Sequence, residues 1–456
     1  MKQMNSFGDL CAVIKKKIDE LEESENKPDE VLKRQSRAIL GLENEVNYYR
    51  NLIRKILSDS GFSCELPAWY DSLEEGVFQE NLGFSCLSEW IKGTREELKS
   101  SSSAKVIGDR VYFQIGGELV LQPQTLPYER RMQLRRALLL TAPQNRNSDP
   151  YHEVYLEDGS RVTIFSEGIS KRGQDTIVFR KFFVKNYTFE KQAELHTIPR
   201  EAIDLFKSMV RVGYNVAFVG AVKTAKTTFL ATWQSYEDQQ LEGVQLETDP
   251  ELPWHLIMPK APILQLVPDG IESLKKIIKP VMRADGDYII MAEARDGYSL
   301  GIAVKAANKG TRRVKMTFHT TDSIDFCYDV ADEIVLAQGG NLYSRMIKVA
   351  KSFHFIFHFV QLADKSKKRL KAIWEIRYND SLGDISMVKI CEYDYVKDSW
   401  VWSGCIGEDK RIIGAEESPE ALERMEKELS ELARNYPMQG DPVNHPYYAH
   451  LKGVAL

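Results

Sequence analysis

The sequence predicts an α/β protein whose main domain holds a mostly parallel sheet, preceded by a smaller α+β domain and a helical N-terminal segment. Beyond residue 200, short continuous apolar runs alternate with helical stretches, as in strands that helices bury on both faces. Between residues 105 and 180, apolar and polar residues alternate along short runs, which is typical of half-buried strands. In residues 1–60, apolar side chains recur at helical spacing with Lys and Glu between them.

The composition is that of an ordinary globular protein. The chain has 456 residues and a net charge of −5, from 61 Lys and Arg against 66 Asp and Glu. At about 100–200 residues per domain, this length allows two to four domains. Apolar residues make up 43% and charged residues 28%, which excludes collagen, low-complexity disorder and a disulfide-dense scaffold. The near-neutral charge argues against a general nucleic-acid coat, which would be basic overall.

The cysteines and the N-terminus predict an intracellular protein. None of the six cysteines forms a C-x-x-C pair, so we expect neither a zinc site nor a disulfide framework. No apolar run approaches the roughly 18 residues of a membrane span, and the N-terminus lacks a signal-peptide core before its charges. The cysteines are Cys11, Cys64, Cys86, Cys327, Cys391 and Cys405.

These patterns divide the chain into five segments. We expect a helical segment over 1–100, an α+β domain over 101–186, a linker over 187–199, an α/β domain over 200–412, and a C-terminal helix and tail over 413–456. The tail helix has Pro419 in its first turn, where proline is well tolerated. The strands expected in the α/β domain are NVAFVG, VQLET, DYIIMAEAR, VKMTFHTT, EIVLAQ, FHFIFHFVQL and KAIWEIRYN.

A phosphate-binding loop is the most informative motif. The strand 216–219 runs into Gly220, a short loop, and then Lys226 and Thr227 at the start of an apolar helix. This follows the pattern G-x-x-x-x-G-K-[ST], in which N–H groups at a helix N-terminus surround a phosphate. Lys226 is expected to reach the β- and γ-phosphates, and Thr227 to hold Mg²⁺. The expected nucleotide-binding residues are Gly220, Lys223, Thr224, Ala225, Lys226, Thr227 and Thr228.

The loop departs from the pattern at Ala225, which replaces the last glycine. If this residue needs a positive φ, alanine costs about 1–2 kcal/mol there. An incidental strand–turn–helix with a Lys-Thr pair is the alternative that these eight residues leave open.

A second acidic element follows about 65 residues later. Asp287 begins, and Glu293 ends, the strand-like run DYIIMAE. Because ligands of α/β sheets bind at the carboxyl ends of the strands, Glu293 is expected near the phosphate loop. Asp287 is an uncertain candidate for the metal.

Four boxes in order resemble the secretion ATPases of type II and type IV systems, nearest to the tight-adherence (Flp) pilus assembly branch. Shorter runs at Asp158–Val162 and Val178–Phe182 resemble two upstream strands of that family. The boxes are Gly220–Thr228, Val244–Leu252, Met282–Arg295 and Lys309–Thr321. The matching side chains include Glu247, Glu251, Arg283, Asp287, Glu293, Arg295 and His319, whereas Ala225, Thr248, Gly286, Ala292 and Thr311 depart from the pattern.

The resemblance implies a RecA-like P-loop ATPase that works as a hexameric motor with ATP and Mg²⁺. It implies a cytoplasmic protein at the inner face of the membrane, with inner-membrane platform proteins as partners and no specific nucleic acid. Glu293 would orient the attacking water, with Glu247 near the same Mg²⁺. The candidates for sensing or stabilising the phosphates are Arg161, Arg180, Arg283, Arg295 and His319.

Several alternatives remain open. The missing glycines leave room for a catalytically weak scaffold subunit of the same machinery, and the fold class leaves room for a nucleic-acid-translocating motor. His354 and His358 lie four apart on a strand, but a structural role is favoured over a metal pair. Arg312, Arg313 and Lys315 are interpreted as a solvated loop, or as a contact to a neighbouring subunit's nucleotide.

Overall fold

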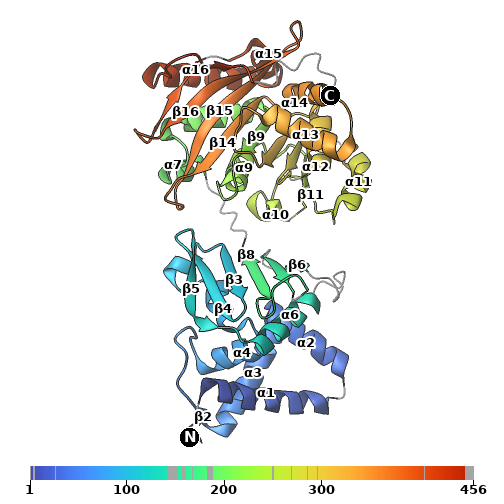
Figure 1. Ribbon diagram of the computed structural model, residues 1–456, viewed down its shortest axis with the longest axis vertical. Coiled ribbons are helices and arrows are strands. Elements are labelled where there is room, and N and C mark those ends of the chain that lie inside the picture. The colour runs from blue at the N-terminus through green and yellow to red at the C-terminus, as the bar shows by residue number, and fades with distance from the viewer. Residues whose placement is uncertain are drawn as a thin grey trace. The chain divides into compact units, whose positions relative to one another are not determined.

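A computed structural model shows two compact units, residues 1–183 and 184–456 (Figure 1). Each unit is described by itself. The structure describes residues 2–3, 6–25, 27–140, 151–156, 160–166, 168–181, 188–248, 251–268, 270–284, 286–294, 296–404 and 406–446.

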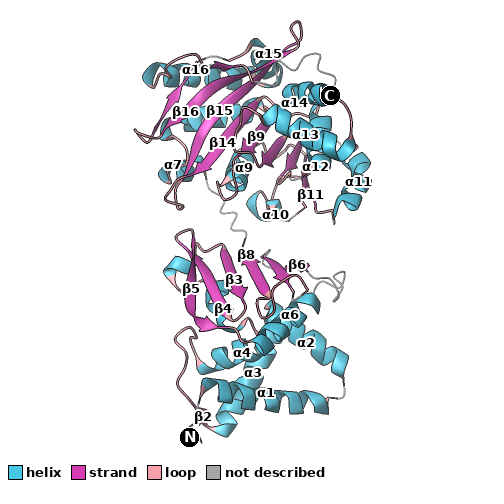
Figure 2. Ribbon diagram, in the orientation of Figure 1, coloured by secondary structure: helices cyan, strands magenta, loops and turns pink. Residues whose placement is uncertain are grey.

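The first unit joins helices to a six-stranded antiparallel sheet of order β5-β4-β3-β8-β7-β6 (Figure 2). Its helices are α1 (Phe7–Ser24), α2 (Pro28–Leu40), α3 (Glu43–Ser60), α4 (Leu73–Leu82), α5 (Ser88–Lys92) and α6 (Tyr128–Leu140), with short 3₁₀ turns at Ser85–Leu87 and Glu96–Leu98. Its strands are β1 (Lys2–Gln3), β2 (Phe62–Ser63), β3 (Ser103–Ile107), β4 (Arg110–Ile115), β5 (Glu118–Thr125), β6 (Tyr151–Tyr155), β7 (Arg161–Phe165) and β8 (Thr176–Arg180).

The helical segment and the sheet of this unit share a core. Leu134 and Leu138 of α6 are fully buried in one cluster with Val106 and Phe113 of the sheet, and Ile39 of α2 belongs to the same cluster. Segments 1–100 and 101–183 therefore pack together within one compact unit.

The second unit is built on a ten-stranded sheet of order β11-β10-β12-β13-β9-β14-β15-β16-β17, with β18 paired to β16. Its helices are α7 (Phe189–Glu194), α8 (Ile203–Val212), α9 (Lys226–Ser235), α10 (Trp254–Ile257), α11 (Gly270–Val281), α12 (Gly297–Ala307), α13 (Phe326–Gln338), α14 (Leu342–Ser352), α15 (Glu408–Glu417) and α16 (Pro419–Asn435), with a 3₁₀ turn at Arg200–Ala202. Its strands are β9 (Val216–Val219), β10 (Gly243–Leu246), β11 (Ile263–Leu266), β12 (Tyr288–Met291), β13 (Lys315–Phe318), β14 (Phe355–Gln361), β15 (Lys368–Asn379), β16 (Asp384–Asp394), β17 (Ser399–Trp402) and β18 (Val443–Asn444).

This sheet is parallel from β11 to β14 and antiparallel from β14 to β18. The α/β class is confirmed, and the residues of the predicted site follow the parallel strands. One strand prediction is wrong, because EIVLAQ lies in α13. That helix buries Cys327, Val330, Ala331 and Ile334, at positions i, i+3, i+4 and i+7, so its buried apolar residues form one helical face.

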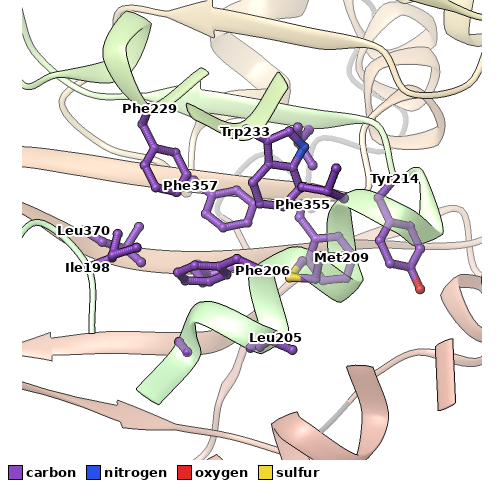
Figure 3. Close-up of a cluster of buried hydrophobic side chains, with 14 of the residues drawn as sticks. Ile198, Leu205, Phe206, Met209, Tyr214, Phe229, Trp233, Phe355, Phe357 and Leu370 are labelled. Carbon is purple, nitrogen blue, oxygen red and sulfur yellow. The ribbon is translucent and has the colours of Figure 1, made fainter. Parts of the chain in front are cut away.

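An aromatic core fixes the helix that follows the phosphate loop. Phe229 and Trp233 of α9 pack with Phe206 of α8 and Phe357 of β14 (Figure 3), and the Trp233 and Phe357 rings are 5.0 Å apart. Aromatic contacts of this kind bury large apolar areas with defined geometry. The core thereby holds α9 against the sheet and so fixes the position of Lys226, the first residue of the helix.

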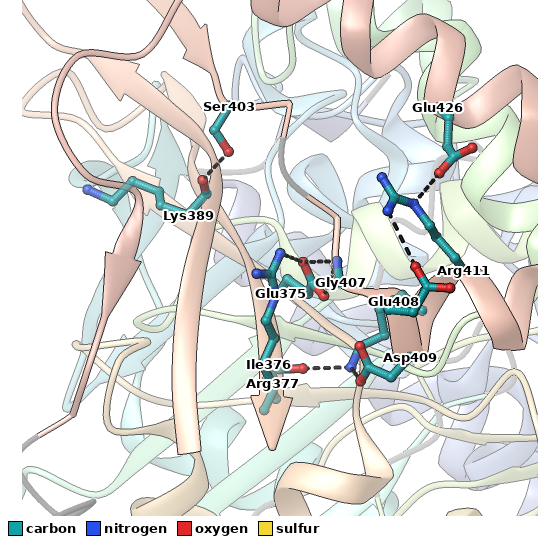
Figure 4. A network of polar contacts seen from close by, with 11 residues as sticks. Glu375, Ile376, Arg377, Lys389, Ser403, Gly407, Glu408, Asp409, Arg411 and Glu426 are labelled. Atoms are coloured by element: carbon teal, nitrogen blue, oxygen red, sulfur yellow. Dashed lines mark hydrogen bonds and ion pairs between the residues drawn. The ribbon is translucent and has the colours of Figure 1, made fainter. Parts of the chain in front are cut away.

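The C-terminal segment is part of the second unit. The buried carboxylate of Glu375 in β15 accepts hydrogen bonds from the backbone N–H of Gly407 and from Arg377, and Lys410 of α15 donates to the Ile376 carbonyl at 2.7 Å (Figure 4). Leu422, Met425 and Leu429 of α16 belong to the core that contains α8.

No helix in the described ranges combines the length and the apolar character needed to cross a bilayer. The described cysteines, Cys11, Cys64, Cys86, Cys327 and Cys391, are free thiols, and Cys405 lies outside the described residues.

Candidate nucleotide site

The loop between β9 and α9 has the backbone of an anion-binding loop. Gly220 has a φ of 144°, and a Cβ there would lie 2.2 Å from the Phe359 carbonyl, so only glycine fits. Lys223 and Ala225 also have positive φ, of 64° and 71°. Successive turns of this kind aim N–H groups inward, and α9 begins directly afterwards at Lys226.

Ala225 adopts the left-handed conformation in which alanine is strained, with φ 71° and ψ 23°. A left-handed residue other than glycine costs about 1–2 kcal/mol. The loop therefore retains the glycine geometry of the motif without the glycine.

We expect Ala225→Gly to stabilise the folded protein by about 1 kcal/mol or less. The gain comes from relieving the left-handed alanine, and part of it is lost because glycine makes the unfolded chain more flexible. The free energy of unfolding in urea measures the change. Ala221→Gly is the matched control, because Ala221 lies in the same loop without a positive φ and should lose stability. Equal effects of the two substitutions would contradict the strain.

Lys226 lies inside the loop. Its side chain is buried, and its Nζ donates to the carbonyls of Gly220 at 2.9 Å and Ala221 at 2.7 Å. The ammonium group is thus held among the loop's own carbonyls. Thr224 reinforces the loop by donating from Oγ1 to the Ala221 carbonyl at 2.9 Å.

His319 connects the loop lysine to the acidic strand end. Its Nδ1 is 3.2 Å from Lys226 Nζ, and its Nε2 is 3.3 Å from Glu293 Oε1. Lysine can only donate and a carboxylate can only accept, so a neutral imidazole with its proton on Nε2 satisfies both contacts. The expectation that Glu293 lies near the phosphate loop agrees with this geometry.

The strand neighbours hold this chain of contacts in place. Thr317 of β13 donates from Oγ1 to the carbonyl of Ala292, and the N–H of Ala294 donates to the Thr317 carbonyl at 3.2 Å. Glu293 and His319 therefore leave adjacent strands at the same edge.

Glu247, which follows β10, binds the backbone of two residues further along the chain. Its buried carboxylate accepts the backbone N–H groups of Glu251 at 3.0 Å and Leu252 at 3.2 Å. Burial raises the pKa of Glu247 to about 9, despite these hydrogen bonds. The expected role of Glu247 beside Mg²⁺ stays a prediction, since both oxygens serve the backbone here.

The pKa of Glu247 predicts a pH-dependent stability. Between its unfolded value of 4.5 and about 9, folding takes up a proton, so the wild-type protein loses stability relative to Glu247→Gln as the pH rises. The difference should grow by at most about 1.4 kcal/mol per pH unit and level off above pH 9. Urea unfolding without nucleotide or Mg²⁺ measures it. Glu242→Gln, at the exposed residue just before the same strand, should show no such trend.

Two candidates lie at the other edge of the sheet. Asp287 directly precedes β12, whose far end leads to Glu293, and its Oδ2 accepts the Glu242 N–H at 2.8 Å. Because β12 runs parallel to β13 and β13 to β9, Asp287 lies at the edge opposite the phosphate loop. The uncertain metal assignment of Asp287 is therefore wrong. Arg283 is exposed and also precedes β12, away from the loop of its own chain.

The other arginine candidates lie in the first unit or outside the described residues. Arg161 and Arg180 are register partners on β7 and β8 of the first unit, on the sheet face opposite Val162 and Phe179 of the core. Their approach to a nucleotide stays a prediction. Arg295 lies outside the described residues.

Lys315 and Arg313 belong to a buried ion-pair cluster, which corrects their interpretation as part of a solvated loop. Lys315 Nζ lies 2.9 Å from Glu237 Oε1, and both side chains are almost fully buried. Arg313 Nη1 lies 2.8 Å from Glu237 Oε2, while Arg312 pairs with Glu416 and Glu417 near the end of α15.

His354 and His358 are buried structural side chains. His354 Nδ1 accepts the Asn215 N–H at 3.1 Å, and His358 Nδ1 is 3.0 Å from Ser323 Oγ. Burial lowers the pKa of both, that of His358 to about 4. No cluster of three or more metal-ligating side chains occurs among the described residues.

The site offers oxygen donors suited to a hard cation. Thr227 follows Lys226 at the start of α9, and Glu293 supplies a carboxylate at the neighbouring strand edge. Hydroxyl, carboxylate and phosphate oxygens are what Mg²⁺ prefers. The donor set therefore fits a nucleotide-bound Mg²⁺.

Comparison with known proteins identifies one family. Residues 168–392 match the family described as type II/IV secretion system protein. No curated protein matches the chain.

Solved structures that resemble the chain are secretion and pilus ATPases of low sequence identity. One is the Brucella suis VirB11 ATPase of a type IV secretion system in complex with sulphate (16% identity, 63% of this chain and 94% of that chain, TM-score 0.34). Another is the Legionella pneumophila ATPase DotB (14% identity, 81% and 90%, TM-score 0.47). A third is the pilus retraction motor PilT with bound ADP (16% identity, 74% and 89%, TM-score 0.45).

Proposed function

Because the chain belongs, through residues 168–392, to the type II/IV secretion system protein family, we propose that it is a cytoplasmic ATPase of a secretion or Flp-type pilus assembly system. It works as a ring oligomer, a hexamer, at the inner face of the membrane, where it meets platform proteins. Hydrolysis of Mg-ATP drives motion of its domains. The observation that carries the proposal is the chain of contacts Lys226–His319–Glu293 inside a P-loop fold.

The residues of the loop bind and orient the phosphates. The N–H groups of the loop and of the first turn of α9 donate to the phosphate oxygens, and Lys226 exchanges the carbonyls of Gly220 and Ala221 for the β- and γ-phosphates. Mg²⁺, when bound with the nucleotide, neutralises charge on the phosphates. Thr227 would hold it.

Glu293 orients the attacking water, and His319 responds to a phosphate bound in the loop. The Glu293 carboxylate orients the attacking water, which is the main requirement in phosphoryl transfer. His319 donates to Glu293 from Nε2 and accepts from Lys226 at Nδ1. When Lys226 turns to the phosphate, Nδ1 loses its donor. The histidine thereby couples the occupancy of the loop to the position of the carboxylate.

ATP turnover of the purified chain tests the function. Wild-type protein should hydrolyse Mg-ATP, and Lys226→Ala should bind and hydrolyse it far more weakly, while Lys305→Ala, an exposed lysine of α12, should match the wild type. Nucleotide should also change the oligomeric size in size-exclusion chromatography with light scattering. A wild-type rate no higher than that of Lys226→Ala contradicts the motor.

A catalytically weak scaffold subunit is the second candidate, favoured by Ala225. The left-handed alanine adds a Cβ to the loop where the motif has only hydrogen, which narrows the space for a phosphate. On this alternative, wild-type protein binds nucleotide without turnover, and Ala225→Gly raises the affinity. Stimulation of turnover by DNA would instead favour a nucleic-acid motor, and the binding would then weaken steeply with salt.

A further inference from the structure

A pocket between α8 and α16 is lined by two arginines that form no ion pair with any described group. It has a volume of about 370 Å³ and lies in the second unit. Arg211 and Arg424 line it, and within the described ranges neither guanidinium group makes an ion pair or a hydrogen bond. The pocket is lined by Lys207, Ser208, Arg211, Tyr236, Ser418, Glu420, Ala421 and Arg424.

Ser208 adds an observation that points to a ligand. Its side chain is only 8% exposed, it lines the pocket, and its hydroxyl has no hydrogen-bond partner among the described residues. A serine in a helix usually donates to a carbonyl of the preceding turn or to water. This hydroxyl donates to no described carbonyl, so it is available to a group bound in the pocket.

Other polar groups around the pocket have partners of their own. Lys207 pairs with Glu190 at 2.7 Å, and Tyr236 donates to the same carboxylate at 2.8 Å, so this pair is neutral. The carbonyls of Val210 and Arg211 at the end of α8 accept hydrogen bonds from Arg313. Glu420 is the acidic side chain of the lining, against two arginines.

We propose that this pocket binds a phosphate group. Two guanidinium groups present planar sets of N–H donors, which bind phosphate oxygens in pairs. The hydroxyls of Ser208 and Ser418 also line the pocket, and the Ser418 side chain does not cap α16. The two guanidinium groups and the two hydroxyls make four donor groups. A carboxylate has only two oxygens to accept from them, whereas a phosphate group has four. The site is separate from the nucleotide loop, because Arg211 precedes β9 and the loop follows it.

Phosphate binding in this pocket does not depend on the proposed ATPase function. Tyr236, in the lining, caps the end of α9, which begins at the phosphate loop. A phosphate bound here would therefore tie α16 to the far ends of α8 and α9. Its source is either a free phosphate compound or the headgroup of an anionic phospholipid.

Equilibrium dialysis with labelled orthophosphate tests the site. Lys226→Ala removes the main phosphate ligand of the nucleotide loop, so binding that remains in this variant belongs to the pocket. Adding Arg211→Ala and Arg424→Ala should weaken that binding about tenfold for each arginine, as the loss of a charge-assisted hydrogen bond predicts. Glu420→Gln should tighten it, because a like charge is removed.

The matched control replaces two exposed arginines of the same unit outside the pocket, Arg200→Ala and Arg434→Ala, in the Lys226→Ala background, and should leave binding unchanged. In wild-type protein the bound phosphate should fall from two to one per chain when Arg211 and Arg424 are replaced, which keeps the test valid if Lys226→Ala does not fold. Absence of phosphate binding in folded Lys226→Ala, or equal binding with and without the two arginines, overturns the site.

Vesicle flotation identifies the source of the phosphate. Full-length protein is floated with phosphatidylglycerol or phosphatidylcholine vesicles at the same salt concentration. Flotation with phosphatidylglycerol that is lost in Arg211→Ala/Arg424→Ala assigns a lipid headgroup. Arginine-dependent orthophosphate binding without flotation assigns a free phosphate compound.

Discussion

Replacing Glu293 with Gln is expected to lower ATP turnover by about 10²–10⁴-fold, the range for losing a group that acts on the reacting water. Nucleotide binding should change little, because Lys226 and the loop are untouched. Gln can still accept the hydrogen bond from His319 Nε2 that Glu293 Oε1 accepts at 3.3 Å. The substitution therefore removes the negative charge but keeps the contact with His319. Steady-state turnover and nucleotide affinity, measured together, separate the two effects.

Asp287→Asn is the control for this prediction. Asp287 is the carboxylate at the other end of β12, and its contact with the Glu242 N–H can be kept by an amide oxygen. Turnover of Asp287→Asn should stay close to wild type. A loss in Asp287→Asn as large as that in Glu293→Gln would show that the catalytic edge of the sheet has been wrongly assigned.

Replacing Glu237 with Gln is expected to cost about 3–5 kcal/mol of unfolding free energy, the range for breaking a buried ion pair from one side. Gln has nearly the same shape as Glu, so the lost unfolding free energy comes from the missing negative charge. Lys315 and Arg313 would keep their burial without a carboxylate 2.9 Å and 2.8 Å away. Urea unfolding at neutral pH measures the change.

The pH dependence of that loss gives a second check. Burial lowers the pKa of Lys315 already in the wild type, and Glu237 opposes the effect. Without Glu237 the pKa falls further, so the folded protein of the variant gains stability as the pH rises toward the unfolded value of 10.5. The deficit should therefore shrink between neutral and alkaline pH.

Asp380→Asn provides the comparison for a surface pair. Asp380 pairs with Lys351 at 2.6 Å, but both side chains are well exposed. Its loss should cost less than about 1 kcal/mol. Equal losses at Glu237 and Asp380 would contradict the importance of burial.

Local patterns predicted the central part of the site. Gly220, Lys226 and Glu293 follow or end short apolar strands, and strand ends in a parallel sheet converge on one edge. Ala225 has the positive φ that the motif requires of its last glycine, because this backbone conformation is set within the loop and not by distant contacts.

Other features depend on contacts between distant segments. EIVLAQ has the composition of a strand, yet it forms the end of α13. Its helical conformation depends on packing against other segments, which the short run of residues does not reveal. Lys315 looks like part of a solvated basic loop, but its partner Glu237 is separated from it by many residues. Glu247 directly follows β10, but its contacts with the backbone of Glu251 and Leu252 form only in the folded protein.

The ion pair at Glu237 acquires another meaning beside the contact of Lys226 with His319. Glu237 lies just beyond the end of α9 and pairs with Lys315, the first residue of β13. At the other end, Lys226 begins α9 and contacts His319, which directly follows β13. Side-chain contacts thus join the helix and the strand at both ends. While Lys226 contacts His319, these two contacts oppose sliding of α9 along β13.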